Sequence, residues 1–135
     1  NKDIPDQRLT EFINEHKDIF ENRLYFFSNI EEKELKKFYL NAELVVYPSF
    51  AEGFGIPPLE AAVYKKKVIC SNATAMAEFN FFNYFVDPYN QKEIENAMLS
   101  VLVDEDDEKL NEIQKIVLES YNWSNSTKVL ISLIE

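Results

Sequence analysis

The chain has 135 residues, which is enough for one domain with a hydrophobic core but not for two. Its 46% hydrophobic and 14% aromatic residues exclude an intrinsically disordered chain. Fourteen basic residues against twenty-four acidic ones leave a net charge of −10, which argues against a nucleic-acid partner and against binding to an anionic membrane.

Cys70 is the only cysteine, so it cannot form an internal disulfide, and its apolar neighbours predict a buried thiol in a reducing compartment. No apolar run reaches the length of a membrane span, and no signal peptide is visible. We therefore expect a cytoplasmic chain. Because it begins with Asn1 rather than Met, we also expect it to be a fragment of a longer protein.

Apolar spacing and turn residues predict alternating helices and strands. In chain order they are a helix at 6–17, a strand at 23–29, a helix at 31–43, a strand at 44–48, a helix at 57–66, a strand at 67–71, a short helix at 74–80, a strand at 84–88, and helices at 90–104, 108–121 and 124–135. The strands are continuously apolar, which is typical of a parallel sheet covered on both faces. We therefore expect an α/β, Rossmann-like fold that binds its ligand outside the carboxyl ends of the strands.

Both glycines of the chain, Gly53 and Gly55, lie in the stretch AEGFGIPPLE between a predicted strand and the next helix. Glycine lets the backbone approach a ligand closely, and a helix that starts near Pro57 directs its N–H groups toward this loop. That arrangement suits a diphosphate. The two prolines lack N–H groups, so the expected donors are Phe54, Gly55, Ile56 and Leu59.

Two glutamates bracket this loop. Glu60, which the pattern places in the first turn of the helix, should reach sideways to ribose hydroxyls, and Glu52 should accept from hydroxyls of a sugar on the other side. Together they predict a nucleotide-sugar site. A purely structural interpretation stays open for each part, since an acidic residue near a helix start favours the dipole and two glycines often form only a turn.

Residues 42–72 resemble the C-terminal nucleotide-sugar-binding domain of the retaining glycosyltransferases of GT-B fold, family 4, known as glycosyl transferases group 1. The family pattern is a glutamate, seven residues and a second glutamate, framed here by Pro48-Ser49, Glu52-Gly53-Phe54-Gly55 and Glu60-Ala61. Weaker similarity extends from about Tyr25 to Trp123-Ser124.

The resemblance implies a role for each matching residue. Glu52 would contact the donor sugar and is the catalytic candidate, Glu60 would hold the ribose, and Asn29 and Ile30 would flank the nucleobase. The donor-binding set is Glu52, Gly53, Phe54, Gly55, Ile56, Glu60, Asn29, Ile30 and Ser49. The family also implies transfer with retained configuration, assisted by the departing phosphate, with no cofactor and no metal.

The chain departs from the family pattern in two ways. Ser28 and Lys65 stand where the family usually has glycine, and Lys67 stands where it has proline. In addition, residues 1–22 do not match the strand–helix–strand unit whose Arg and Lys neutralise the diphosphate. We therefore expect residues 1–135 to be an incomplete C-terminal domain, inactive alone, whose exposed sheet edge allows self-association.

The expected function is donor binding in a glycosyltransferase that moves a sugar from a nucleoside-diphosphate sugar to a polysaccharide such as lipopolysaccharide, a glycolipid or another glycoconjugate. The acceptor would bind the missing N-terminal domain, and the whole protein would work in the cytoplasm or at the inner face of the membrane. Two alternatives are a nucleotide-sugar epimerase of GT-B fold and a non-catalytic nucleotide-sugar-binding subunit that needs a partner chain.

Three further features admit simpler interpretations than a site. The acidic run at 104–108 has the spacing of a metal-binding motif, but we interpret it as the cap of the next helix. His16 lies among charged residues and is interpreted as a surface residue. Tyr121 and Trp123 are predicted to anchor the last helix by packing.

Overall fold

A computed structural model describes residues 6–134, so the ends of the predicted domain, residues 1–5 and 135, lie outside the described part. The chain divides after Leu35 into two compact units. The first contains α1 (Gln7–Glu15) and α2 (Lys17–Phe20), which replace the single helix predicted at 6–17. Asp6 caps α1, because its carboxylate accepts hydrogen bonds from the backbone N–H groups of Arg8 and Leu9.

The strand predicted at 23–29 is wrong, since residues 24–28 have an irregular backbone. Aromatic residues favour strands where their side chains pack on a half-buried pleated surface. Tyr25 and Phe26 are exposed instead, and the Tyr25 hydroxyl donates to the carbonyl of Asn22. The local preference for a strand is therefore not realised in this segment.

The second unit, from Lys36 onward, contains the sheet. Its elements follow the predicted order. They are α3 (Glu32–Asn41, whose first residues lie before the division), β1 (Leu44–Tyr47), α4 (Ile56–Val63), β2 (Lys67–Ser71), the 3₁₀ helix η1 (Thr74–Glu78), β3 (Tyr84–Val86), α5 (Gln91–Val103), α6 (Asp107–Ser120) and α7 (Trp123–Ser132).

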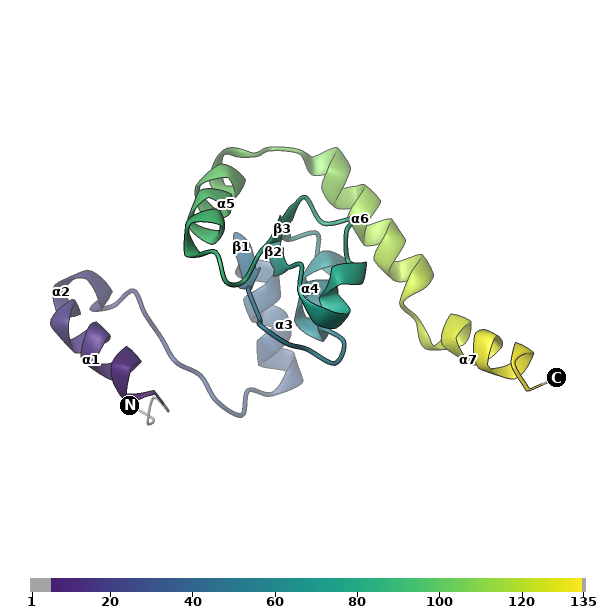
Figure 1. Cartoon of the computed structure of the whole chain (residues 1–135), viewed down its shortest axis with the longest axis horizontal. Helices are drawn as coiled ribbons and strands as arrows, with labels where there is room; N and C mark the ends of the chain where they lie inside the picture. Colours follow the sequence, from purple (N-terminus) through teal and green to yellow (C-terminus); the bar gives the residue numbers. More distant parts are fainter. Residues whose placement is uncertain (1–5, 135) are drawn as a thin grey trace. The chain divides into compact units, whose positions relative to one another are not determined.

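The three strands pair in parallel in the order β1-β2-β3, which confirms an α/β, Rossmann-like architecture (Figure 1). Tyr47 at the end of β1 lies opposite Cys70, and Cys70 lies opposite Phe85. Parallel strands need long crossover connections, and α4 and η1 supply them here. The described sheet therefore has three strands where four were predicted.

The two faces of the sheet carry different helices, and Figure 1 shows the strands between α4 and α5. On the α5 face, Ile69 and Val86 pack with Ala97 and Val101 in a buried cluster. On the other face, α4 packs on β1 and β2, with Leu59 and two alanines buried. Side chains alternate between faces along a strand, so the two cores share β2, the central strand.

Helix α4 ends in a hydrogen-bonded turn. The N–H groups of Lys65 and Lys66 donate to the carbonyls of Ala62 and Ala61, the two bonds of a Schellman motif. Lys65 has a φ of 54°, a left-handed conformation that favours glycine. The glycine that the resemblance implies at this position would suit this backbone, and Lys65 adopts it at an energetic cost.

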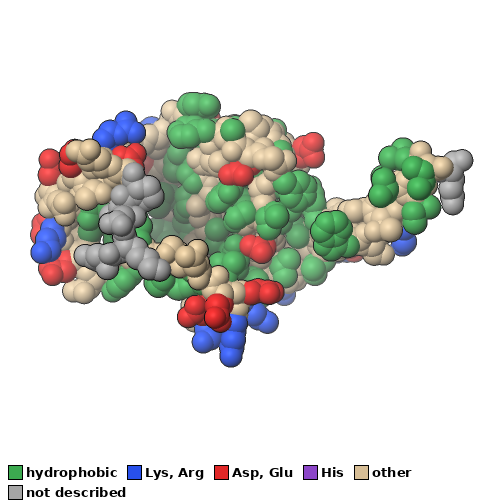
Figure 2. Space-filling view, turned by 90° about the horizontal axis from the view of Figure 1, so that it is seen from below, with side chains coloured by type: hydrophobic (Ala, Val, Ile, Leu, Met, Phe, Trp, Pro, Cys, Tyr) green, Lys and Arg blue, Asp and Glu red, His purple; other side chains and the backbone are tan. Residues whose placement is uncertain are grey.

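Helices α6 and α7 follow the sheet. Ile113 and Val117 of α6 are buried, and Gln114 donates to the Val63 carbonyl at the end of α4, with an N···O distance of 2.7 Å. No residue of α7 that the structure describes is buried, and Figure 2 shows hydrophobic side chains in green along this helix, at the right of the view. The predicted anchoring role of Trp123 is wrong, because 88% of its surface is exposed. Within residues 6–134, no helix is long and apolar enough to cross a membrane.

Candidate functional site

The loop that contains both glycines joins β1 to α4. It leaves the sheet at the carboxyl end of β1, and because the strands are parallel, the segments that follow β2 and β3 leave at the same edge. Hydrogen bonds tie the loop after β1 to the last residue of β2 and to the segment that follows β2. The Ser71 hydroxyl donates to the Ser49 carbonyl at 2.7 Å, and the Glu52 N–H donates to the Thr74 hydroxyl at 3.0 Å.

The two glycines have different structural roles. Gly55 is the N-cap of α4, with a φ of 95°, and a Cβ placed on it would lie 2.6 Å from Met76 Cγ and 3.2 Å from the Phe79 ring. Glycine is therefore required at Gly55 by the backbone conformation and by contact with η1. A Cβ on Gly53 would have no heavy atom within 4 Å. Close approach of a ligand at this loop stays a prediction.

The start of α4 corrects two details of the predicted donor set. The helix begins at Ile56, which puts Glu60 in the second turn rather than the first. In an α-helix the unpaired N–H groups are those of the N-cap and the first three residues. Pro57 and Pro58 have no N–H group, and Leu59 comes after these positions, so Gly55 and Ile56 are the helix-start residues with N–H groups for an anion.

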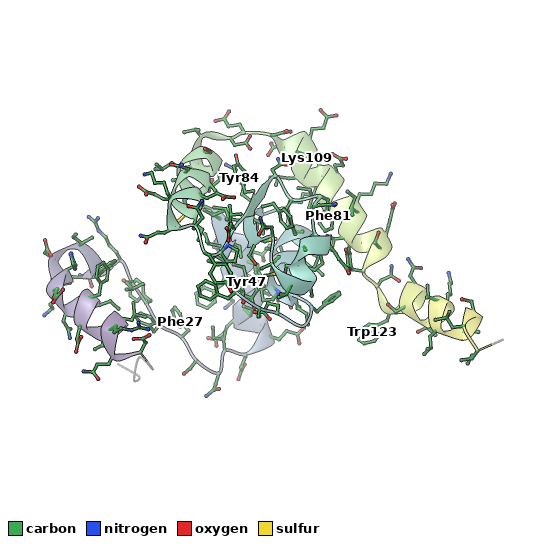
Figure 3. The ribbon with its side chains drawn as sticks, in the orientation of Figure 1. Phe27, Tyr47, Phe81, Tyr84, Lys109 and Trp123 are labelled. Carbon is green, nitrogen blue, oxygen red and sulfur yellow. The ribbon has the colours of Figure 1, made fainter. Side chains whose placement is uncertain are left out.

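Glu52 lies in the loop that follows β1, with its carboxylate held by a tyrosine hydroxyl. Tyr47, labelled in Figure 3, donates its hydroxyl to Glu52 Oε1 at 2.7 Å. Hydrogen bonding from the Tyr47 hydroxyl holds the pKa of the Glu52 carboxyl below its usual value. The same hydrogen bond raises the pKa of Tyr47. Glu52 is therefore an ionised hydrogen-bond acceptor near neutral pH.

Glu60 is held from a different direction. The hydroxyl of Tyr39, a buried residue of α3, donates to Glu60 Oε2 at 2.9 Å. The carboxylate of Glu60 thus lies toward the neighbouring helix α3 rather than along the axis of α4. That Glu60 reaches ribose hydroxyls stays a prediction.

The side chain of Phe54 belongs to an aromatic cluster, defined by Phe54, Phe79, Phe81, Phe82 and Tyr121. Phe54 packs edge-on against Phe79 and Tyr121, with ring centroids 5.9 and 6.0 Å apart. Tyr121 also contacts Phe79 and Phe81, which confirms it as a packing residue. Ile56, the next member of the predicted donor set, is 58% exposed.

Asn29 and Ile30 belong to the first unit, and Glu52 and Glu60 belong to the second. Asn29 is exposed and has a φ of 54° at a bend, and Ile30 is half-buried. The described contacts bring Glu52 together with Tyr47 and Thr74, and Glu60 together with Tyr39. A nucleobase-binding role for Asn29 and Ile30 stays a prediction.

The acidic run at 104–108 serves structure, as predicted. Asp106 caps α6 by accepting from the Lys109 N–H, and Asp104 accepts from the Tyr84 hydroxyl at 2.8 Å. Among residues 6–134, no group of three or more His, Cys, Asp and Glu side chains lies close enough to hold a metal ion. A hollow in the surface lies beside these residues. It is at the amino ends of β2 and β3, whereas the glycine loop is at the carboxyl end of β1. The hollow is lined by Lys66, Lys67, Val68, Phe82, Asn83, Tyr84, Asp104, Asp106, Leu110 and Ile113.

Sequence reasoning missed the residues that hold the two glutamates. Tyr47 directly precedes Pro48-Ser49, so its position beside the motif was a signal for the contact with Glu52. Tyr39 lies 21 residues before Glu60, and no local pattern relates the two.

Comparison with known proteins relates the chain to one protein family. The profile of the family described as Glycosyl transferases group 1 matches residues 8–119. The chain is 29% identical over 114 residues to the O-antigen chain mannosyltransferase B of Escherichia coli, covering 83% of this chain and 30% of that protein.

Two other relatives have related names. The O-antigen chain mannosyltransferase RfbU of Salmonella typhimurium is 33% identical over 81 residues, covering 59% of this chain and 23% of that protein. The serotype-specific mannosyltransferase WbdA of Escherichia coli is 32% identical over 85 residues, covering 62% and 10%. The chain therefore spans less than a third of the length of each of these three relatives.

Proposed function

The chain belongs to the glycosyl transferases group 1 family, and from this premise we propose that it is the donor-binding part of a retaining, family 4 glycosyltransferase of GT-B fold. It would bind a nucleoside-diphosphate sugar whose sugar is transferred to a polysaccharide, glycolipid or other glycoconjugate. The observation that carries the proposal is the position of Glu52 and Glu60, which flank a glycine loop and a helix start at the carboxyl edge of a parallel sheet.

Each part of the site has a proposed role. Glu52 accepts hydrogen bonds from hydroxyls of the donor sugar, and Glu60 accepts from the ribose hydroxyls. The N–H groups of Gly55 and Ile56 face the diphosphate, where the positive end of the α4 dipole favours an anion. Ser49 and the backbone of Gly53 and Phe54 complete the sugar side, and Asn29 and Ile30 flank the nucleobase.

The proposed reaction breaks the bond between the sugar C1 and the phosphate oxygen and forms a bond from C1 to an acceptor oxygen on the same face. Because the acceptor bonds to C1 on the face that the phosphate leaves, the configuration is retained without a protein nucleophile. The acceptor proton passes to the departing phosphate. The role of Glu52 is to orient the sugar during this exchange. The proposal includes no metal, so addition of EDTA should leave donor binding unchanged.

The names of the relatives point to a mannosyl group as the first sugar to test and to a surface polysaccharide as the product. The acceptor is proposed to bind elsewhere in the whole protein. The whole protein is proposed to work in the cytoplasm or at the inner face of the membrane. Fractionation of cells that express the whole protein would test this location.

Calorimetric titration of the chain tests donor binding directly. GDP-mannose and UDP-glucose are the probes, each compared with its free nucleoside diphosphate. We expect binding of at least one probe, and we expect Glu60→Gln to weaken it about tenfold, because a neutral amide accepts more weakly than a carboxylate. Glu52→Gln should weaken the sugar nucleotide more than the free diphosphate.

Glu112→Gln is the matched control, since Glu112 lies on the surface of α6 in an ion pair with Lys109. It should leave binding unchanged. A chain that binds neither probe, or equal effects of all three substitutions, would contradict the proposed donor site. Transfer of sugar to a glycan acceptor is then to be assayed with the whole protein, where retention of configuration is read from the product.

A further inference from the structure

The two glutamates of the proposed donor site share one structural feature. Each accepts a hydrogen bond from a tyrosine on another element, from Tyr47 at the end of β1 to Glu52 and from Tyr39 on α3 to Glu60. The O···O distances of 2.7 and 2.9 Å are those of well-formed hydrogen bonds. Each tyrosine occupies one oxygen of its carboxylate.

Tyr39 is a rigid donor. It is 8% exposed, and its ring stacks on Tyr64 with centroids 5.7 Å apart and planes 14° from parallel. Burial, together with the hydrogen bond to Glu60, raises the pKa of Tyr39, so the hydroxyl keeps its proton. The buried ring thereby fixes the point from which Glu60 is held.

Tyr47 is positioned by the sheet. It is the last residue of β1, and its backbone is in register with Cys70 on β2. The segment from Tyr47 to Glu52 is also held at its far end, where the Glu52 N–H donates to Thr74. Both ends of the short span that carries Glu52 are thus tied to neighbouring elements.

A glutamate side chain on a protein surface samples several rotamers, and ordering it on ligand binding weakens affinity. A hydrogen bond already made in the absence of ligand removes part of that cost. With one oxygen held, the second oxygen of each carboxylate has a defined direction. A hydroxyl of the sugar nucleotide would donate its hydrogen bond to this second oxygen.

We propose that Tyr47 and Tyr39 are positioning residues, which hold Glu52 and Glu60 in the orientations that accept the sugar and ribose hydroxyls of the donor. The inference rests on the proposed donor site for its ligand, and on the two hydrogen bonds for its geometry. Neither tyrosine needs to contact the donor.

The test compares Tyr47→Phe and Tyr39→Phe with Tyr84→Phe as the matched control. Tyr84 is also a strand tyrosine, and it donates to the carboxylate of Asp104. It packs against the buried cluster on the α5 face of the sheet, whereas the strand register places Tyr47 on the other face. All three substitutions remove one hydroxyl and keep the ring. Circular dichroism melting curves verify that each variant is folded.

Binding provides the first readout, with GDP-mannose and UDP-glucose and with the matching free diphosphates. Tyr47→Phe should weaken binding of the sugar nucleotide about tenfold and leave that of the free diphosphate unchanged, because Glu52 faces the sugar. Tyr39→Phe should weaken both about tenfold, because Glu60 faces the ribose. Tyr84→Phe should weaken neither, and a merely structural role of the two tyrosines would not produce this split.

The pKa of Glu52 provides a second readout that needs no ligand. It is followed by NMR of ¹³C-labelled glutamate carboxyl groups during a pH titration, with Glu52→Gln to assign the signal. Tyr47→Phe should raise this pKa, whereas Tyr39→Phe and Tyr84→Phe should leave it unchanged. This readout remains decisive for Tyr47 even if a variant binds weakly.

The outcomes separate the two proposals. If Glu52→Gln and Glu60→Gln weaken binding but neither tyrosine substitution does, the positioning role is wrong and the donor site stands. If the unmodified chain binds neither probe, the donor site is wrong, and an unchanged pKa of Glu52 in Tyr47→Phe would overturn the positioning contact as well. If Tyr39→Phe fails to fold, the positioning role is tested at Tyr47 by a double-mutant cycle of Tyr47→Phe with Glu52→Gln. Additive losses of binding free energy for the sugar nucleotide would contradict the proposal, and less-than-additive losses would support it.

Discussion

The requirement for glycine at Gly55 can be tested by comparing two substitutions in one loop. In Gly55→Ala, the new side chain must adopt a φ near 95°, which costs about 1 kcal/mol for a residue with a Cβ. The Cβ would also lie 2.6 Å from Met76 Cγ, and Met76 is fully buried, so the core must shift. Overpacking of this kind costs about 1–3 kcal/mol, so we expect a total loss of about 2–4 kcal/mol.

Gly53→Ala is the matched control, since its Cβ would meet open space. It should leave the free energy of unfolding unchanged or raise it by up to about 1 kcal/mol through lower entropy of the unfolded chain. Urea denaturation followed by circular dichroism measures both variants. Equal losses in the two variants, or a loss below about 1 kcal/mol in Gly55→Ala, would refute the reasoning.

Three other predictions concern stability and reactivity. Lys65→Gly should raise the free energy of unfolding by about 0.5–1 kcal/mol, because Lys65 has a φ of 54° after α4. Lys115→Gly, inside α6, is the control and should lower the free energy of unfolding by a similar amount in the same denaturation assay. The Cys70 thiol is fully buried, and burial raises its pKa to about 12. A thiol reagent at pH 8 should therefore label Cys70 only as fast as the chain unfolds. Rapid labelling of the native chain would contradict the burial of this thiol. Because the folded state lowers the pKa of Glu52, its ionised form stabilises the fold above the unfolded pKa of about 4.5, and this stabilisation is lost as the pH falls through the folded pKa. The acid-induced loss of unfolding free energy should be smaller in Tyr47→Phe than in the unmodified chain. An equal loss in both proteins would contradict the Tyr47–Glu52 contact.

The sheet and its helices could be predicted because each has a local signature. The segments at 44–48, 67–71 and 84–88 are short apolar runs bounded by polar residues or proline, and they form β1, β2 and β3. The acidic run at 104–108 was interpreted as a helix cap from its position before a helical pattern, and within it the carboxylate of Asp106 accepts from the Lys109 N–H. Such signals depend on residues within a few positions of one another.

Predictions that required knowledge of distant contacts were wrong or incomplete. Aromatic residues at 23–29 favour a strand locally, yet the segment is irregular. Trp123 has the character of a packing residue, but it is exposed, while its neighbour Tyr121 packs in the aromatic cluster. Propensity describes what a segment prefers, and burial depends on which surface lies next to it.

The sequence by itself determined the parallel α/β pattern, the glycine loop between β1 and α4, and the two glutamates that bracket this loop. Only the tertiary structure decided how the two glutamates are held. The contact of Tyr39 with Glu60 spans 21 residues and depends on α3 lying beside α4, and the need for glycine at Gly55 depends on Met76 of η1. Hydrogen bonds and close contacts of this kind act through space over a few ångströms, so they exist only once packing has brought separate segments together.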